Sequence, residues 1–310
     1  MRVVLAGNNS AAVRVLDLLL EAEISDNVLC LAPPPAERAS WHRSLAPEAI
    51  DRGVRTLQPS DVNSPETIET IRSFEPTMLL SVYYTQIFRR ALIESVHGPC
   101  INLHPSLLPK HRGVAPLIWA IVDGDNATGA TAHLIDRGID TGAVLLQRRL
   151  PIHPDDTGAE LHDKAARLVA AMCAELLRAH RAGIDLSVGR AQTGRASYRD
   201  RREPSVNHLV WSDPRGRIRN IVRALAPPLP GAFAFVDDVR VMVLHVEPDH
   251  GRGRRPWRPG ALSLSGDVPV VWAADGPLRL VTIDLMDGRG PVPGREIASI
   301  SGAYEGSVLS

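Results

Sequence analysis

Residues 2–20 read RVVLAGNNSAAVRVLDLLL and contain the two signals that decide the fold. Residues 2–6 form a short apolar run that ends at Gly7, a pattern typical of a buried parallel strand. After Asn9 or Ser10, either of which is a suitable N-cap, apolar residues recur at helical spacing at positions 13, 16, 19 and 20. A short strand that leads directly into a helix is the first unit of an α/β fold.

The same alternation continues along the first two thirds of the chain. Apolar runs predict strands over 28–32, 78–82 and 100–104, and periodic segments predict helices over 67–74, 89–95 and 158–182. Such alternation indicates a parallel sheet with helices on both faces. The loop after the first strand lacks the full G-x-G-x-x-G pattern, so we expect a Rossmann-like sheet that binds no NAD.

The pattern changes after a polar, arginine-rich stretch at 189–204, which we interpret as a linker. Short β-type runs follow, separated by Gly, Pro and Asp turns, at 236–246, 262–264, 268–273 and 278–283. This spacing predicts a small β-barrel. With a boundary near residue 200, we expect an α/β domain over 1–200 and a β-rich domain over 205–310.

Composition narrows the class of protein. The chain has 310 residues, and its 35 Lys+Arg balance 35 Asp+Glu, which argues against a dedicated nucleic-acid binder. The three cysteines, Cys30, Cys100 and Cys173, form no C-x-x-C pair, so neither a disulfide scaffold nor a cysteine-rich zinc site is expected. Without an 18-residue apolar run or the pattern of a signal peptide, the sequence predicts a cytoplasmic globular protein.

The residues best suited to chemistry lie in the stretch NLHPSLLPKHRG at 102–113. In a strand over 101–104, Asn102 and His104 share one face, and Pro105 ends the strand. Both side chains then stand at the carboxyl end of a strand, where open α/β sheets bind ligands. An amide beside an imidazole can polarise a carbonyl and move a proton, although a half-buried Asn and His at a strand corner would give the same short pattern.

A second stretch, DRGIDTG at 136–142, follows the apolar run 130–135. Asp and Gly are also what a plain turn contains. A carboxylate returned to the imidazole would favour its protonated form and fix its tautomer, so Asp140 beside His104 would complete an amide–imidazole–carboxylate set. Sequence spacing alone does not show that contact. The histidines 104, 111 and 133 have no recognised zinc-ligand spacing, and we expect no metal.

Taken together, INLHPSLLPKHRG at 101–113 and DRGIDTG at 136–142 resemble the signature of the formyltransferase family, whose members use 10-formyltetrahydrofolate. The segments APLIWAI at 115–121, DGD at 123–125, SVYYTQIF at 81–88 and IVRALAPPLPGAFAF at 221–235 also resemble that family. The resemblance is strongest to sugar-nucleotide N-formyltransferases, and methionyl-tRNA formyltransferases are more distant. It implies a Rossmann-like catalytic domain followed by a small OB-like barrel.

The resemblance also implies roles for individual residues. His104 would be the general base and acid, Asn102 would stabilise the oxyanion, and Asp140 would raise the basicity of His104. The residues that would hold the folate, largely through backbone groups, are Gln86, Ile87, Phe88, Val114, Asp136, Arg137, Gly138, Ile139 and Asp140. Val114 stands where closer sugar-modifying relatives carry arginine, which leaves the acceptor open.

The sequence is compatible with three functions. We expect transfer of a formyl group to a small-molecule amine, foremost an amino-sugar nucleotide, with an amino acid or a specialised-metabolite precursor as further acceptors. The alternative is a methionyl-tRNA formyltransferase, and a non-catalytic folate-binding relative is the third. Residues 205–310 contain 12 Arg and 11 Asp+Glu, which is too balanced for an RNA-gripping domain, despite the basic run at 252–255. We therefore expect neither a nucleic-acid nor a membrane partner, and a homodimer is compatible with the reading.

Overall fold

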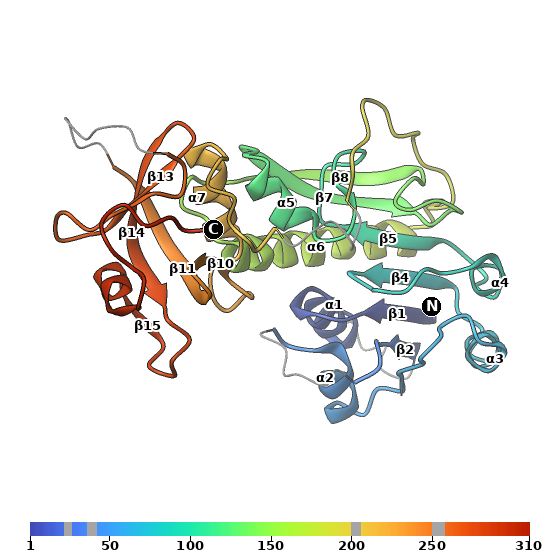
Figure 1. Ribbon diagram of the computed structural model, residues 1–310. Coiled ribbons are helices and arrows are strands. Elements are labelled where there is room, and N and C mark those ends of the chain that lie inside the picture. The colour runs from blue at the N-terminus through green and yellow to red at the C-terminus, as the bar shows by residue number, and fades with distance from the viewer. Residues whose placement is uncertain (22–26, 36–41, 200–205, 250–257) are drawn as a thin grey trace. The chain divides into compact units, whose positions relative to one another are not determined.

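A computed structural model describes residues 1–310 except 22–26, 36–41, 200–205 and 250–257 (Figure 1). The chain forms two compact units. The first consists of residues 1–116, 127–151 and 162–201, and the second of residues 117–126, 152–161 and 202–310. The expected boundary near residue 200 and the basic run at 252–255 lie outside the described residues.

The first unit contains a seven-stranded sheet in the order β3-β2-β1-β4-β5-β7-β8. Its strands are β1 (Val3–Gly7), β2 (Val28–Leu31), β3 (Thr56–Leu57), β4 (Met78–Val82), β5 (Cys100–His104), β7 (Ala127–Leu134) and β8 (Val144–Pro151). The first five in chain order pair in parallel, and the strand order reverses at β1 as in a doubly wound fold. The Rossmann-like fold predicted from the sequence is confirmed.

The sheet is mixed, because two strands that the sequence did not predict add to the parallel strands at one edge. β7 runs antiparallel to β5, and β8 runs antiparallel to β7. The run 130–135 is the end of β7, a strand that the sequence analysis did not assign. The loop 135–143 joins it to β8, and a connection of that length is too short for the crossover that a parallel pair needs.

Helices cover both faces of this sheet (Figure 1). Buried side chains of α1 (Ser10–Glu21), α2 (Leu45–Asp51) and α6 (Gly158–Arg181) pack on one face. Those of α3 (Pro65–Ser73) and α4 (Arg90–Ile93) pack on the other. α3 begins where the Ser64 side chain accepts the N–H of Thr67, with a proline in its first turn. Every strand residue of β1, β2 and β4 is buried, as continuous apolar runs predict.

The second unit is built on an antiparallel sheet in the order β10-β11-β14-β13-β12. The strands are β10 (Ala232–Val236), β11 (Val239–Pro248), β12 (Leu262–Ser263), β13 (Val270–Ala273), β14 (Gly276–Asp284) and β15 (Pro291–Pro293), which pairs with β14. The predicted strand 236–246 is two strands, β10 and β11, joined by a turn at Asp237. Helices α5 (Pro116–Val122) and α7 (Arg215–Ala224) and a 3₁₀ helix (Gly294–Ser299) are the remaining helices in the described ranges.

The end of the chain joins the two edges of this sheet. Ser310 and Phe235 of β10 exchange both backbone hydrogen bonds. Leu309 donates to Gly260 and Leu262 donates to Ser307, beside β12. Residues 307–310 therefore satisfy backbone groups at both edges, which is how a small barrel removes its exposed strand edges.

The stretch 189–204 is more ordered than a linker, as far as it is described. Tyr198–Arg199 forms β9, which pairs in parallel with Arg112–Gly113, or β6. Arg190 and Val144 exchange two backbone hydrogen bonds. The expectation of a plain linker over 189–199 was wrong, because its order comes from backbone pairing that leaves no apolar pattern in the sequence.

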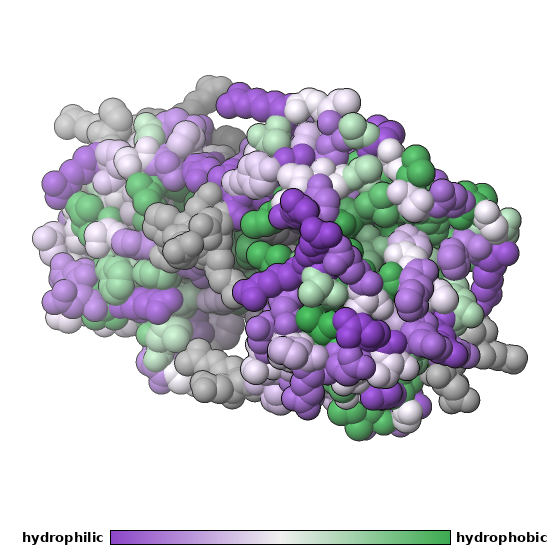
Figure 2. All heavy atoms as spheres, turned by 90° about the vertical axis from the view of Figure 1, so that its right-hand side faces the viewer, coloured by the Kyte–Doolittle hydropathy of each residue, from purple (hydrophilic) through white to green (hydrophobic). Residues whose placement is uncertain are grey.

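On the face that Figure 2 shows, hydrophilic side chains predominate and hydrophobic ones are exposed in separate patches. Within the parts of the chain that the structure describes, no helix has both the length and the apolar character needed to span a membrane.

Candidate active site

β5 presents Asn102 and His104 on one face of the sheet. Because side chains alternate along a strand, Ile101 and Leu103 enter the core under α1 and α6, and Cys100 lies in the core on the opposite face. Asn102 and His104 share the face of Cys100. His104 is the last residue of β5, between β4 and β7. The two side chains predicted from the period of two therefore do lie together.

The His104 ring is buried and its two nitrogens face oxygen atoms. Nε2 donates to the His111 carbonyl at 2.8 Å, and Nδ1 lies 3.5 Å from Oδ2 of Asp140. Burial lowers the pKa of His104 below its ordinary value, and the nearby Asp140 charge and the His111 carbonyl offset this lowering only in part. His104 is consequently neutral at pH 7, with Nδ1 as the atom that can take a proton.

Asp140 reaches this face from the loop between β7 and β8. Leu134, at the end of β7, lies opposite Ile101. The loop therefore starts near the amino end of β5 and returns across the face of that strand to Asn102. Oδ1 of Asp140 accepts from Nδ2 of Asn102 at 3.1 Å, and Oδ2 accepts the N–H of Gly113 at 2.8 Å. The structure thus brings together the three residues that the sequence suggested from two separate stretches.

Asp140 is held ionised despite its burial. Burial alone would raise the pKa of its carboxyl, but the neighbouring His133 and His104 rings and the Gly113 N–H together lower that pKa from 3.8 to about 2. Its backbone has a φ of 54°, in the left-handed region that residues other than glycine rarely adopt. The surrounding contacts therefore fix both the charge and the conformation of Asp140.

We expect Asp140 to make stability fall in acid. Because its folded-state pKa of about 2 lies below 3.8, the ionised carboxylate stabilises the fold above about pH 4, and this stabilisation is lost as the pH falls towards 2. The contribution is about 2 kcal/mol. Urea unfolding of the wild type and Asp140→Asn between pH 2 and 7 measures it. The difference between the two proteins should shrink by that amount in acid, and a difference independent of pH would contradict the assignment.

His133 is a member of the site that the sequence analysis did not assign. It lies opposite Asn102 in the β5–β7 register. Nδ1 of His133 donates to the Leu134 carbonyl at 2.8 Å, and Nε2 lies 3.1 Å from Nδ2 of Asn102 and 3.5 Å from Oδ1 of Asp140. Once the antiparallel pairing of β7 is known, strand alternation places His133 on the face of Asn102, but the sequence does not reveal that pairing.

Both N–H groups of the Asn102 amide are consequently engaged, one by Asp140 and one by His133. A role in stabilising an oxyanion requires one of these N–H groups to turn away from its partner. The bond to Asp140 is the stronger of the two, because its acceptor is an ionised carboxylate. The N–H now given to His133 is therefore the one available to a carbonyl oxygen.

Gly113 is where the first motif stretch approaches β9 most closely. Its φ is 91°, and a Cβ at this position would overlap the carbonyl oxygen of Arg199. The same residue supplies the N–H that Asp140 accepts. Only glycine satisfies these requirements together.

Gly113→Ala should therefore lower the free energy of unfolding by about 3 kcal/mol, from backbone strain and overlap combined. Gly194→Ala is the matched control, since Gly194 has a φ of 99° but nothing within 4 Å of a Cβ. It should lose only about 1 kcal/mol. Urea titrations of the two variants compare them, and equal losses would show that the approach to Arg199 does not matter.

The residues expected to bind folate after β4 divide into two kinds. The Gln86 side chain accepts the Val62 N–H at 2.8 Å and donates to the Pro59 carbonyl at 3.0 Å, so it holds two loops together. Phe88 is buried against Tyr84, with ring centroids 5.3 Å apart. Ile87 between them is 66% exposed, so its side chain is the one available to a ligand.

The remaining expected folate residues lie on exposed loop positions. Val114, next to Gly113, is 41% exposed, and Ile139, next to Asp140, is 51% exposed. Arg137 and Gly138 are also exposed. Asp136 accepts from the Gly138 N–H and the Thr141 hydroxyl, and so shapes the loop from within. The backbone of 136–140 is thus ordered, while the apolar side chain of Ile139 stays exposed.

A second polar cluster lies at the carboxyl edge of β1 and β4, on the face of α1 and α6. Nδ2 of Asn9 and Nε2 of His162 are 3.1 Å apart, and the Tyr83 ring meets the His162 ring edge to face at 5.5 Å. Burial lowers the pKa of His162 to about 4. The Tyr83 hydroxyl is buried and has no hydrogen-bond partner among the residues that the structure describes. Tyr83 follows Val82, which pairs with Leu103, so it stands level with His104 one strand away.

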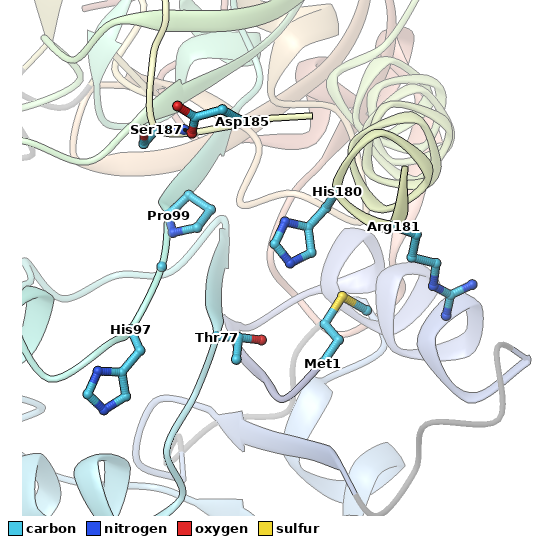
Figure 3. Close-up of a pocket in the computed structure, with 9 residues that line it drawn as sticks. Met1, Thr77, His97, Pro99, His180, Arg181, Asp185 and Ser187 are labelled. Atoms are coloured by element: carbon cyan, nitrogen blue, oxygen red, sulfur yellow. Dashed lines mark hydrogen bonds between the residues drawn. The ribbon is translucent and has the colours of Figure 1, made fainter. Parts of the chain in front are cut away.

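A hollow of about 590 Å³ lies at the opposite end of the sheet (Figure 3). Met1, Thr77 and Pro99 line it, and each lies within two residues of the start of β1, β4 or β5. His97 and Arg181 lie on opposite sides of it and do not converge on one point (Figure 3). Because the amino ends of the strands form this hollow, it is remote from Asn102, His104 and Asp140. Across the described part of the chain, no group of three or more His, Cys, Asp and Glu could hold a metal ion.

Comparison with protein families matches residues 1–176 to Formyl transferase and residues 203–300 to Formyl transferase, C-terminal domain. Among curated proteins, the chain is similar to the methionyl-tRNA formyltransferase of Caldanaerobacter subterraneus subsp. tengcongensis. The two are 33% identical over 314 residues, covering 100% of both proteins. The methionyl-tRNA formyltransferase of Citrifermentans bemidjiense is also 33% identical, over 94% of this chain and 91% of its own.

Among solved structures, the chain is similar to an N-formyltransferase from Helicobacter canadensis in complex with folinic acid and dTDP-3-aminofucose. The TM-score is 0.73 with 20% identity, over 90% of this chain and 98% of that one. At this identity the likeness establishes a shared fold.

Proposed function

Because the chain belongs to the formyl transferase family, we propose that it moves the formyl group of 10-formyltetrahydrofolate to the methionine amine of a charged initiator tRNA. The observation that carries this choice of acceptor is the 33% identity to methionyl-tRNA formyltransferases along the whole chain. From the sequence, an amino-sugar nucleotide is the acceptor expected first and methionyl-tRNA the alternative; the similarity to methionyl-tRNA formyltransferases supports the alternative.

The residues around the polar trio fit a folate donor. Ile87, Val114 and Ile139 are apolar yet exposed, and they lie after β4, directly after β6, and in the loop after β7. Exposed apolar side chains beside a few fixed polar groups are typical of a site for a flat ring system. These three side chains and the backbone of 136–140 would hold 10-formyltetrahydrofolate, which supplies the formyl carbon.

His104 and Asp140 would carry out the proton transfers of the reaction. An amine nitrogen that attacks a formyl carbon becomes positively charged and must lose a proton. Neutral His104 takes that proton at Nδ1, and the ionised Asp140 carboxylate 3.5 Å away stabilises the charged ring. The protonated His104 then delivers the proton to the leaving nitrogen. Both steps use the same ring atom because Nε2 stays bonded to the His111 carbonyl.

Asn102 would stabilise the negative charge that develops on the formyl oxygen. The N–H that His133 accepts in this structure turns to that oxygen, while the other N–H stays on Asp140. A donor already ordered by Asp140 needs little further reorganisation, which is the source of its benefit to the rate. One oxyanion donor of this kind contributes about 10²- to 10³-fold in kcat.

A small-molecule amine is the second candidate acceptor, and charge favours it. The arginines of α7 are engaged within the second unit: Arg215 with Asp275, Arg217 with Asp213, Arg219 with Asp155, and Arg223 with the Asp156 carbonyl. Arginines already held by carboxylates or carbonyls are less available to phosphates. The balanced charge of residues 205–310 points the same way.

A transfer assay separates the two acceptors. Purified protein, 10-formyltetrahydrofolate and either charged initiator tRNA or a panel of amino-sugar nucleotides and amino acids are incubated, and products are identified by mass spectrometry. The proposal expects formylmethionine on tRNA, with a rate that falls steeply as salt rises. Transfer to a small amine and none to tRNA would overturn the choice of acceptor, and no formylated product from any amine would overturn the proposed function.

A further inference from the structure

Residues 190–199 form a strap that is bonded to both loops of the active site. At one end, Arg190 and Val144 exchange two backbone hydrogen bonds beside the 136–142 loop. At the other end, Ser197 accepts the Arg112 N–H at 2.9 Å and donates its own N–H to the Pro109 carbonyl at 3.2 Å. The Ser197 hydroxyl also accepts the His111 N–H at 2.8 Å. The strap therefore connects the loop that carries Asp140 to the loop that carries Gly113.

Gln192 is the side chain of the strap that touches both loops at once. Its Nε2 donates to the carbonyls of Asp140 at 2.8 Å and Gly142 at 2.9 Å. Its Oε1 accepts from Nε and Nη2 of Arg112, at 3.2 and 2.6 Å. Arg112 is also held by Tyr198, to whose hydroxyl it donates and over whose ring its guanidinium lies, 5.2 Å from the centroid. The amide of Gln192 thus uses both its donors and its acceptor inside the site.

These contacts act on the two features that place the Asp140 carboxylate. The backbone of Asp140 has a left-handed φ of 54°, which is strained and persists only if its surroundings hold it. Gln192 holds that backbone through the carbonyls of Asp140 and Gly142. Through Arg112 it also holds the residue before Gly113, whose N–H binds the carboxylate. One side chain therefore supports Asp140 from its backbone and from its carboxylate partner.

We propose that Gln192 is a positioning residue for the reaction, and that it keeps the Asp140 carboxylate aimed at His104 by tying the 136–142 loop to Arg112. This inference rests on the proposed function, since it assumes that His104 and Asp140 move the proton. Gln192 itself touches no reacting atom.

Two variants test which contacts matter. Gln192→Met keeps the length of the side chain and removes all its hydrogen bonds. Gln192→Glu keeps an acceptor for Arg112 but has no N–H for the carbonyls of Asp140 and Gly142. Asn207→Ala is the matched control, because the half-buried Asn207 amide also donates to a backbone carbonyl, that of Gly231 at 3.0 Å, in the second unit.

Both Gln192 variants should lower kcat by about 10- to 100-fold, with KM for 10-formyltetrahydrofolate changed less than threefold, because small misplacement of a catalytic group acts on the rate. If the Asp140 carboxylate moves away from His104, the pKa of His104 falls further. The acid limb of the kcat/KM profile should therefore move to lower pH in both variants. Asn207→Ala should change neither quantity. A Gln192→Glu enzyme with wild-type kcat and pH profile would overturn the inference.

Amide hydrogen exchange supplies a readout that needs no turnover. In Gln192→Met, peptides covering 136–142 and 110–114 should exchange faster than in the wild type, while the rest of the first unit should keep its protection. Asn207→Ala should leave both peptides unchanged. Unchanged exchange in Gln192→Met would refute the positioning role even if no acceptor were found. Faster exchange with no formyl transfer by the wild type would count against the proposed function and leave the positioning contact standing.

Discussion

Replacing Asp140 by asparagine is expected to lower kcat by about 10³-fold or more, comparable with removal of the carboxylate from other imidazole–carboxylate pairs. Asparagine has the shape of aspartate but no charge to stabilise protonated His104, which lies 3.5 Å away. Its amide nitrogen would also face a donor, because Asn102 and the Gly113 N–H both donate to this side chain. Single-turnover formyl transfer at saturating donor measures the effect.

Asp185→Asn is a suitable control for this variant. Asp185 is an exposed aspartate that lines the hollow at the opposite end of the sheet. It should keep the wild-type rate. An Asp140→Asn enzyme within threefold of the wild type, folded as judged by circular dichroism, would show that the carboxylate does not take part in the reaction.

Replacing His104 by alanine is the second change with a large expected effect, a loss of about 10²- to 10⁴-fold in kcat, the range that general acid–base groups contribute. Two histidine rings of the described residues lie within 4 Å of the Asp140 carboxylate, and of these His104 is not bonded to Asn102. Because burial lowers its pKa, it is neutral and able to accept a proton at pH 7. The same single-turnover assay applies, and added imidazole should restore part of the rate by occupying the space of the missing ring.

His97→Ala is the matched control, since His97 is an exposed histidine in the hollow at the amino ends of the strands. It should be as active as the wild type. A loss in His97→Ala equal to that in His104→Ala would place the chemistry at the wrong end of the sheet, and a near-normal rate in His104→Ala would remove the proposed base.

The strands and helices that bury one apolar face were predictable from the sequence. β1, β4 and β5 lie where the apolar runs placed them, and α1 and α6 follow the helical spacing. β7 was missed because ATGATAHL is built of small residues with no clear alternation, and its strand character comes from its neighbours β5 and β8. The order of residues 190–199 was missed for a similar reason, since its bonds are made by the backbone.

The candidate site was predictable in part. The shared face of Asn102 and His104 followed from the alternation of side chains along a strand. Asp140 was suggested by the stretch 136–142 and by the resemblance of that stretch to the family signature. The contact between Asp140 and His104 depends on a loop that folds back across the sheet, which no local pattern records. His133 and Gln192 act through pairings of segments 31 and 52 residues away, so only the folded chain shows that they belong to the site.

The central claim is that His104 and Asp140 act as one unit, and a double-mutant cycle tests it most directly. The single-turnover rates of the wild type, His104→Ala, Asp140→Asn and the double variant are compared under the same conditions. The account predicts that the double variant is no slower than the slower of the two single variants, because either change disables the same proton transfer. Losses that multiply in the double variant would mean that the two residues act independently, and would contradict the account.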